Sequence, residues 1–118
     1  MSPRRASAAE RATVAVARSA PVFAALGDPT RLRLVERLGR EGPLSIARLT
    51  GGTEVTRQAV SKHLRVLAQA GVARGARRGR EQIWQLERAR LDDARRALDR
   101  VAQRWDEVLL RLKAAVET

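Results

Sequence analysis

The sequence has no cysteine, no tyrosine and a single histidine, His63, and aromatic residues make up only 3% of its 118 residues. Without cysteine the chain cannot form a disulfide, a thiolate metal site or a thiol redox switch. One histidine cannot hold a metal ion alone, and no phosphate-binding glycine loop or nucleophile–base pair stands at a useful spacing. We therefore expect neither an enzyme nor a metal or other cofactor.

Long apolar runs are absent too, so no segment is expected to cross a bilayer. The longest apolar stretch near the N-terminus, residues 13–17, is too short for a secretory signal, although a transit peptide is conceivable. A helical pattern that begins inside this stretch favours a cytoplasmic protein with no membrane partner. The length suits one domain. We expect a flexible N-terminus at residues 1–7 and one domain over residues 8–118.

Acidic residues are missing from one segment, residues 55–80, which carries seven basic side chains, whereas residues 81–118 hold eight charges of each sign. The net charge of the whole chain is +11. Because 22 of the basic residues are arginine, a GC-rich genome offers a bland explanation. Genome composition would not empty one segment of carboxylates and balance the next, so the distribution indicates a polyanionic partner for residues 55–80.

Helix start and stop signals divide the first half of the chain. Ser7 is expected to cap a helix that Pro21 stops near residue 19, with Phe23 and Leu26 following as core anchors. Asp28 and the proline after it begin a second helix, which ends at residues 42–43. Leu32, Val35 and Leu38 have helical spacing there, with Leu34 beside them. Ser45 caps a short third helix whose Ile46 and Leu49 face inward.

The fourth helix, residues 56–70, has two chemically different sides. Thr56 is its expected N-cap and Gly71 its C-terminal glycine. Positions on one side are apolar or contain His63, for which we expect a structural role. Polar residues follow the other side at spacings of three and four. The apolar side comprises Ala59, Val60, His63, Leu64, Leu67 and Ala70, and the polar side Arg57, Gln58, Ser61, Lys62 and Arg65.

Two short segments around a glycine turn, residues 72–77 and 81–86, predict a β-hairpin. Trp84 and Leu86 alternate onto one face, which we expect to cover the core. Helix, glycine turn, helix with a basic face and basic hairpin form the order of a winged helix-turn-helix, a mainly α fold with a small β-hairpin wing. In that fold the second helix enters the major groove of DNA.

A heptad seam runs along the last predicted helix, about residues 89–117, with apolar residues alternately three and four positions apart. A seam of this length on a terminal helix needs a partner, and the first helix can cover only part of it. We therefore expect a homodimer, in which Trp105 serves the interface. The interface positions are Leu91, Ala94, Leu98, Val101, Trp105, Val108 and Leu112.

The predicted DNA contacts follow from groove chemistry. We call the helix over residues 56–70 the reading helix. At its start, Arg57 suits guanine and Gln58 suits adenine in bidentate geometry, and Thr56 could bind a phosphate with free backbone N–H groups. Arginines on the hairpin tip suit the DNA backbone or an adjacent minor groove. The predicted site is Thr56, Arg57, Gln58, Ser61, Lys62, Arg65, Arg77, Arg78 and Arg80.

Residues 23–86 resemble the ArsR-type winged helix-turn-helix repressors. The matching stretches are LGDPTRL at 26–32, QAVSKHLRVL at 58–67, AGV at 70–72 and RGR at 78–80, followed by Trp84 and Leu86. The resemblance implies a dimeric repressor of operator DNA, dimerising through its first and last helices, with a recognition helix at 56–70 and a wing at 72–86. It leaves the effector unidentified.

Metal-sensing members of this family carry two cysteines where this chain has Ser45 and Ala47, and other members use histidine on the last helix, which has none here. The C-terminal stretch resembles a non-metal-sensing subgroup. The carboxylate pairs 92–93 and 106–107 are read as surface charge, because adjacent residues on a helix point apart. An architectural nucleic-acid-binding protein without sequence preference is the alternative to a regulator that binds an imperfect palindrome in double-stranded DNA.

Overall fold

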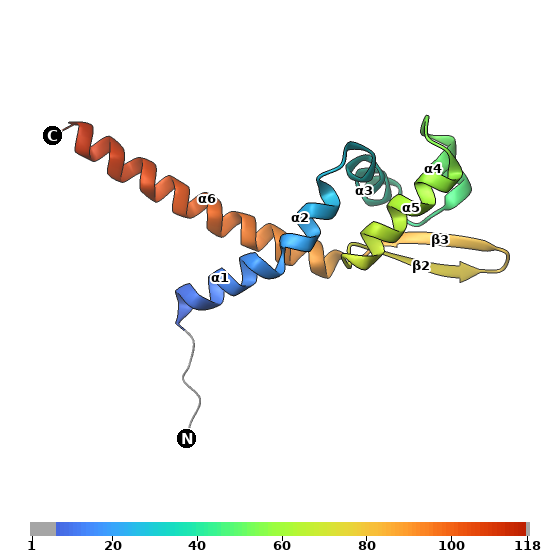
Figure 1. The fold of residues 1–118 in the computed structure, drawn as a ribbon, viewed down its shortest axis with the longest axis horizontal. Coiled ribbons are helices and arrows are strands. Elements are labelled where there is room, and N and C mark those ends of the chain that lie inside the picture. Colours follow the sequence, from blue (N-terminus) through green and yellow to red (C-terminus); the bar gives the residue numbers. More distant parts are fainter. Residues whose placement is uncertain (1–6, 118) are drawn as a thin grey trace, which may run out of the picture.

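The chain forms six helices and three strands over residues 7–117, the part that the computed structural model describes (Figure 1). Apart from Ser7, the predicted flexible N-terminus lies outside these residues. The architecture is the expected winged helix-turn-helix. Its elements are α1 (Ala8–Arg18), α2 (Ala20–Leu26), α3 (Pro29–Glu41), β1 (Leu44–Ser45), α4 (Ile46–Gly51), α5 (Arg57–Gln69), β2 (Ala73–Arg78), β3 (Glu81–Leu86) and α6 (Arg88–Glu117).

Side-chain caps begin four of the helices, as the sequence predicts. The side chains of Ser7, Asp28, Ser45 and Thr56 each accept a hydrogen bond from a backbone N–H two or three residues later. These bonds satisfy donors that the first helical turn leaves free. After α5, Gly71 adopts a φ of +78°, the left-handed conformation that suits a glycine at a helix end.

The segment after α1 corrects one expectation. Helix α1 ends at Arg18, near the predicted position, but the chain then continues as a further helix that was not predicted: Pro21 lies in the first turn of the short helix α2, where its missing N–H costs no hydrogen bond. The rotation of α2 buries Val22 and Ala25, and it leaves Phe23 exposed. Phe23 is therefore not a core anchor, whereas Leu26 packs partly buried against the core.

The inward face of α3 also differs from the expected one. Leu34 and Leu38 are buried and Val35 packs against them, but Leu32 is exposed. Leu34 and Leu38 lie one turn apart, so they share a face of the helix, and Leu32 lies off this face. The expected set was right for Val35 and Leu38 and wrong for Leu32.

The core is small and almost entirely aliphatic. It lies between α2, α3, α4, the inner face of α5 and the hairpin, as the predicted apolar side of α5 required. Trp84 covers one end of it from β3. The largest fully buried side chains are Leu34, Leu49, Val60, Leu64, Leu67 and Val72.

The wing is a three-stranded antiparallel sheet in the order β1–β3–β2, one strand more than the predicted hairpin. Only two residues form β1, Leu44 and Ser45, so no alternation pattern reveals it in the sequence. Gly75 of β2 stands opposite Trp84 of β3, and a Cβ on Gly75 would lie 3.1 Å from the indole. The glycine therefore gives the indole room to lie across the hairpin.

Helix α6 belongs to two environments. Its first turns close the core, because Ala94 is 4% exposed and Leu91 packs beside it, whereas every residue from 98 to 117 is exposed. The seam is thus divided. Ala94, predicted at the dimer interface, is instead buried in the core of its own chain, whereas the place of the partly buried Leu91 at an interface stays a prediction. The radius of gyration is 19.2 Å, against about 13.5 Å for a compact chain of this length.

Candidate nucleic-acid interface

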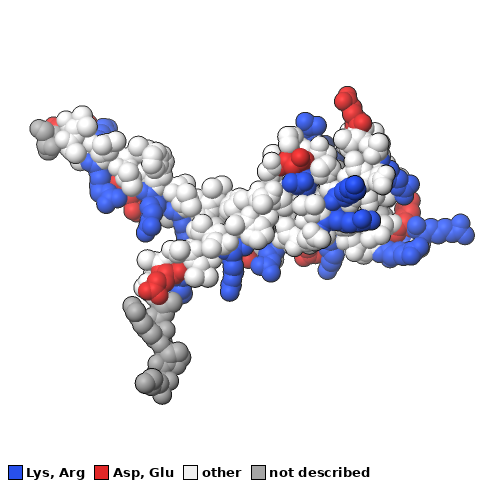
Figure 2. All heavy atoms as spheres, viewed as in Figure 1, with Lys and Arg blue, Asp and Glu red and all other residues white. Residues whose placement is uncertain are grey.

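A basic hollow lies between the outer face of α5 and the wing. Seven of the nine residues predicted to bind DNA line it, and no acidic residue does. Figure 2 shows lysine and arginine gathered over α5 and along the wing, at the opposite end of the molecule from the free end of α6. The seven are Arg57, Gln58, Ser61, Lys62 and Arg65 from α5, with Arg77 and Arg80 from the hairpin.

Burial of the opposite side of α5 fixes which residues face this hollow. Val60, Leu64 and Leu67 are completely buried in the core, so the helix cannot rotate without exposing them. Arg57 and Arg65 consequently project outward from the same face. Two of the predicted side chains lie outside the hollow, since Thr56 is occupied as the N-cap and Arg78 is on the hairpin's other face.

The register of the hairpin separates its arginines. Arg77 pairs with Gln82 across the strands and Gly75 pairs with Trp84, so these four share the face that looks onto α5. Arg78 pairs with Glu81 and points to the opposite face. The predicted site included both Arg77 and Arg78, but of these two only Arg77 lines the hollow.

One basic residue of the acid-free segment is neutralised by a carboxylate from outside it. The Arg74 guanidinium lies 3.1 Å from the Glu87 carboxylate, on the far side of the hairpin. By contrast, within residues 7–117 no ion pair involves Arg57, Lys62, Arg65, Arg77 or Arg80. The free positive charge is therefore concentrated where a polyanion would make contact.

Three residues of the hollow were missed as candidates from the sequence. Ile46 of α4 contributes an apolar wall, and Gln82 and Trp84 of β3 contribute the side next to the wing. The alternation of the second hairpin segment could have revealed Gln82, because it lies two positions before Trp84 and so on the same face. An amide at this place can donate to phosphate or to a base edge.

A polar cluster fastens α5 to the start of α3. The Asp28 carboxylate accepts hydrogen bonds from the N–H groups of Thr30 (2.9 Å) and Arg31 (3.0 Å), and it lies 3.9 Å from His63 Nδ1 of α5. Arg31 Nη1 is 3.4 Å from the same nitrogen, and its Nε donates to the carbonyl of Ala25. The expected structural role of His63 is confirmed by these contacts.

The pKa of Asp28 lies below its usual range. The hydrogen bond from the Arg31 backbone is the largest cause, partial burial opposes it, and the nearby positive groups of His63 and Arg31 lower the pKa further. A carboxyl group whose pKa falls on folding stabilises the fold in its ionised form. The contribution is complete above the unfolded pKa and is lost as the pH falls through the folded value.

Replacement of Asp28 by asparagine should therefore flatten the acid limb of the stability curve. Asparagine keeps a capping oxygen but does not titrate. Between about pH 5 and pH 2, urea unfolding midpoints should fall less steeply for Asp28→Asn than for the wild type. Asp99→Asn, on an exposed part of α6, is the matched control and should follow the wild type. Parallel curves for Asp28→Asn and the wild type would contradict the linkage.

Neither a metal cluster nor a membrane helix is found among residues 7–117. No three histidine, aspartate or glutamate residues of this part of the chain lie together in a way that could hold a metal ion. Within the same residues, no helix combines the length and the apolar character needed to cross a bilayer.

Comparison with known proteins identifies the same architecture. A helix-turn-helix domain family matches residues 26–76. An HTH-type transcriptional regulator of Mycobacterium tuberculosis is 41% identical over 76 residues, which cover 64% of this chain and 70% of that one. A homodimeric winged helix-turn-helix DNA-binding domain of Mycobacterium bovis has the same fold, with a TM-score of 0.62 at 23% identity, over 87% of this chain and 90% of that one.

An ArsR-like transcriptional regulator from Rhodococcus sp. RHA1 superposes with a TM-score of 0.71 at 37% identity, over 83% of this chain and 92% of that one. Both the sequence likeness and this superposition extend well beyond the reading helix. The protein therefore belongs to the ArsR-like family of winged helix-turn-helix transcriptional regulators, which bind DNA.

Proposed function

We propose that the protein is a homodimeric, sequence-specific repressor that reads its operator with α5 and the wing. The observation that carries this proposal is the acid-free hollow, in which seven predicted contact residues from two elements converge. Within residues 7–117 its cations make no ion pair, so they are available to phosphate and bases without first losing a partner.

The geometry supports different roles for the residues that line the hollow, some contacting bases and others the DNA backbone. A helix fits the major groove, about 12 Å wide, and its N-terminal residues meet the base edges. Arg57 and Gln58 occupy this end of α5 and would read bases. Lys62 and Arg65 lie further along the same face, while Arg77 and Arg80 would follow the backbone or enter the adjacent minor groove.

The exposed apolar surface supports a dimer. Helix α1 has no buried residue, and the 20 residues of α6 from 98 to 117 are all exposed. The two helices diverge like the arms of a V (Figure 1), and a cleft lined by Val16 and Ala17 on α1 and Val101 on α6 lies between them. A second copy would bury these side chains. The Mycobacterium bovis domain that has the same fold is homodimeric.

The two-fold symmetry of a dimer and the place of the chain within its family lead to expectations about the operator and the response to metals. Two reading helices would require an imperfect palindrome with half-sites about 34 Å apart. Ser45 and Ala47 stand where metal-sensing members have cysteines, so we place the chain in a non-metal-sensing subgroup. We expect zinc and arsenite to leave operator affinity unchanged, and we expect the protein to act in the cytoplasm without catalysis.

Selection of binding sites from random duplexes tests the proposal. We expect enrichment of one palindromic motif, bound about a thousandfold or more tightly than random DNA, with affinity falling in salt by about 0.9 log units per log unit for each neutralised phosphate. A preference ratio near unity, with the salt dependence retained, would identify an architectural protein instead and would overturn sequence-specific repression.

A further inference from the structure

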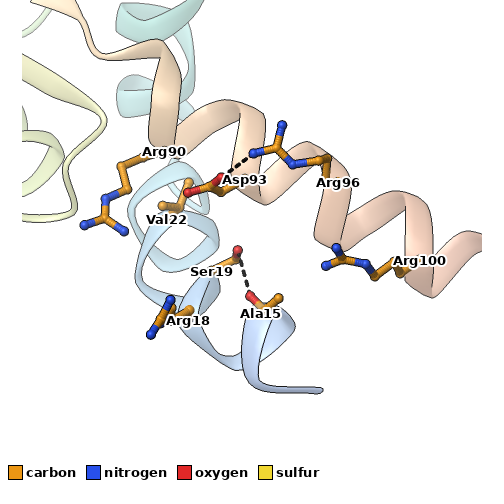
Figure 3. A pocket seen from close by; sticks show the side chains of 8 residues that line it. All are labelled: Ala15, Arg18, Ser19, Val22, Arg90, Asp93, Arg96 and Arg100. Atoms are coloured by element: carbon orange, nitrogen blue, oxygen red, sulfur yellow. Dashed lines mark hydrogen bonds and ion pairs between the residues drawn. The ribbon is translucent and has the colours of Figure 1, made fainter. Parts of the chain in front are cut away.

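A second basic cavity, of about 170 Å³, lies between the junction of α1 and α2 and the first half of α6 (Figure 3). Its inner surface includes Ser19 and Val22, which are both buried. Arg18 and Arg90 lie on one side of these two residues in the view of Figure 3. Arg96 and Arg100 lie on the other. No lining residue is shared with the hollow between α5 and the wing.

The charges around this cavity are unbalanced. Four arginines and one carboxylate residue, Asp93, line it, and the Asp93 carboxylate is ion-paired with Arg96. Within residues 7–117, no ion pair involves Arg18, Arg90 or Arg100. Like charges gathered around one small space repel one another, and an anion placed among them would relieve the repulsion.

We propose that this cavity binds a small anion that carries a phosphate group, as inorganic phosphate or a phosphomonoester. Its volume equals that of about five to six water molecules, which is enough for one phosphate group. The net excess of positive charge favours a doubly charged phosphate over a single carboxylate. Guanidinium groups donate paired hydrogen bonds that match phosphate oxygens. A cavity of this small volume, with Ser19 and Val22 at its inner surface, suits a small molecule better than a DNA backbone.

The surroundings of the cavity connect it to both functional surfaces. A Cβ on Gly71, the glycine that ends α5, would lie 2.9 Å from Cγ of Arg90, so the Arg90 side chain packs directly over the end of the reading helix. Arg100 also lines the cleft between α1 and α6. An anion that holds these two arginines would bias the position of α5 relative to the dimer helices. This regulatory consequence rests on the proposed function, whereas the binding of phosphate does not.

Calorimetric titration of the full chain with inorganic phosphate, and separately with glycerol phosphate, tests the binding. Ionic strength is held constant with chloride, and acetate serves as the monocarboxylate control. We expect saturable binding of at least one phosphate compound, weakened about tenfold or more in Arg18→Gln/Arg100→Gln. Arg88→Gln/Arg111→Gln loses the same charge on exposed positions outside the cavity and should bind as the wild type does.

Two results would overturn the site: no saturable binding of either phosphate compound, or equal weakening in both double variants. Phosphate also acts on proteins without binding, because it is excluded from their surface. This effect would be the same in all variants and would not saturate with phosphate concentration. Preference for glycerol phosphate over inorganic phosphate would identify a phosphomonoester as the ligand.

The proposed effect of the anion on DNA binding is tested by measuring operator affinity with and without the bound phosphate compound at equal ionic strength. We expect a change of about fivefold or more in the wild type and none in Arg18→Gln/Arg100→Gln. Unchanged affinity with the cavity occupied would overturn the regulation but leave the site. A double variant that loses operator affinity without any phosphate present, but keeps the dimer mass in light scattering, would show that these arginines contact DNA instead; loss of the dimer mass would show that Arg100 supports the dimer interface. Failure to bind any DNA would overturn the proposed function while the calorimetric result still stood.

Discussion

Replacing Arg57 and Arg65 together by alanine is expected to weaken operator binding by about 2–6 kcal/mol, a loss of at least about thirtyfold. The two side chains project from one face of α5, lie about 12 Å apart along its axis and share no partner, so their contributions should add. Arg57 lies at the helix end that meets the bases. Its loss should relax the preference at one base pair, whereas the loss of Arg65 should weaken all sequences.

The matched control for this variant is Arg88→Ala/Arg95→Ala, which removes the same charge from exposed positions on α6. Thermal unfolding of both double variants should match the wild type, because none of the four arginines is buried. Titration of fluorescent duplexes at several salt concentrations gives affinity and salt slope together. Equal losses in the two double variants would mean that net charge, and not the hollow, controls binding.

The helix starts and the reading face of α5 could be predicted because both depend on residues close in sequence. A cap such as Asp28 or Thr56 bonds to N–H groups within its own first turn, so the residue type and its position contain the information. The two sides of α5 follow from a repeat of 3.6 residues, and burial of Leu64 and Leu67 confirmed the apolar side.

The expectations that failed, and the features that were missed, depend on segments far apart in the chain. Phe23 has the chemistry of a core residue, but α2 turns Val22 and Ala25 toward the core and leaves Phe23 exposed. Strand β1 exists only because Leu44 and Ser45 pair with β3. The ion pair between Arg74 and Glu87 crosses the hairpin, so charge counting could not reveal it. Helical spacing cannot show that Ala94 is covered by its own chain.

Replacing Trp105 or Leu98 by aspartate is expected to separate the dimer and to lower operator affinity about a hundredfold or more. The two side chains are 61% and 56% exposed in the single chain, so a charge there costs little until a partner covers it. A monomer would hold one half-site alone and would lose the effective concentration that links the two reading helices. Light scattering should give the mass of one chain, 13.0 kDa, in place of two.

Two control variants, Leu110→Asp and Ala94→Asp, test which face and which part of α6 form the dimer interface. Leu110 is 67% exposed on the same helix but points about 140° away from Trp105, so its variant should remain a dimer with full operator affinity. Ala94 is buried in its own core, and aspartate there should unfold the chain because it would place an unpaired charge among apolar groups. Dimer mass and operator affinity retained in both Trp105→Asp and Leu98→Asp would move the interface away from α6. Loss of the dimer in Leu110→Asp would show that the two chains meet over a different face of this helix.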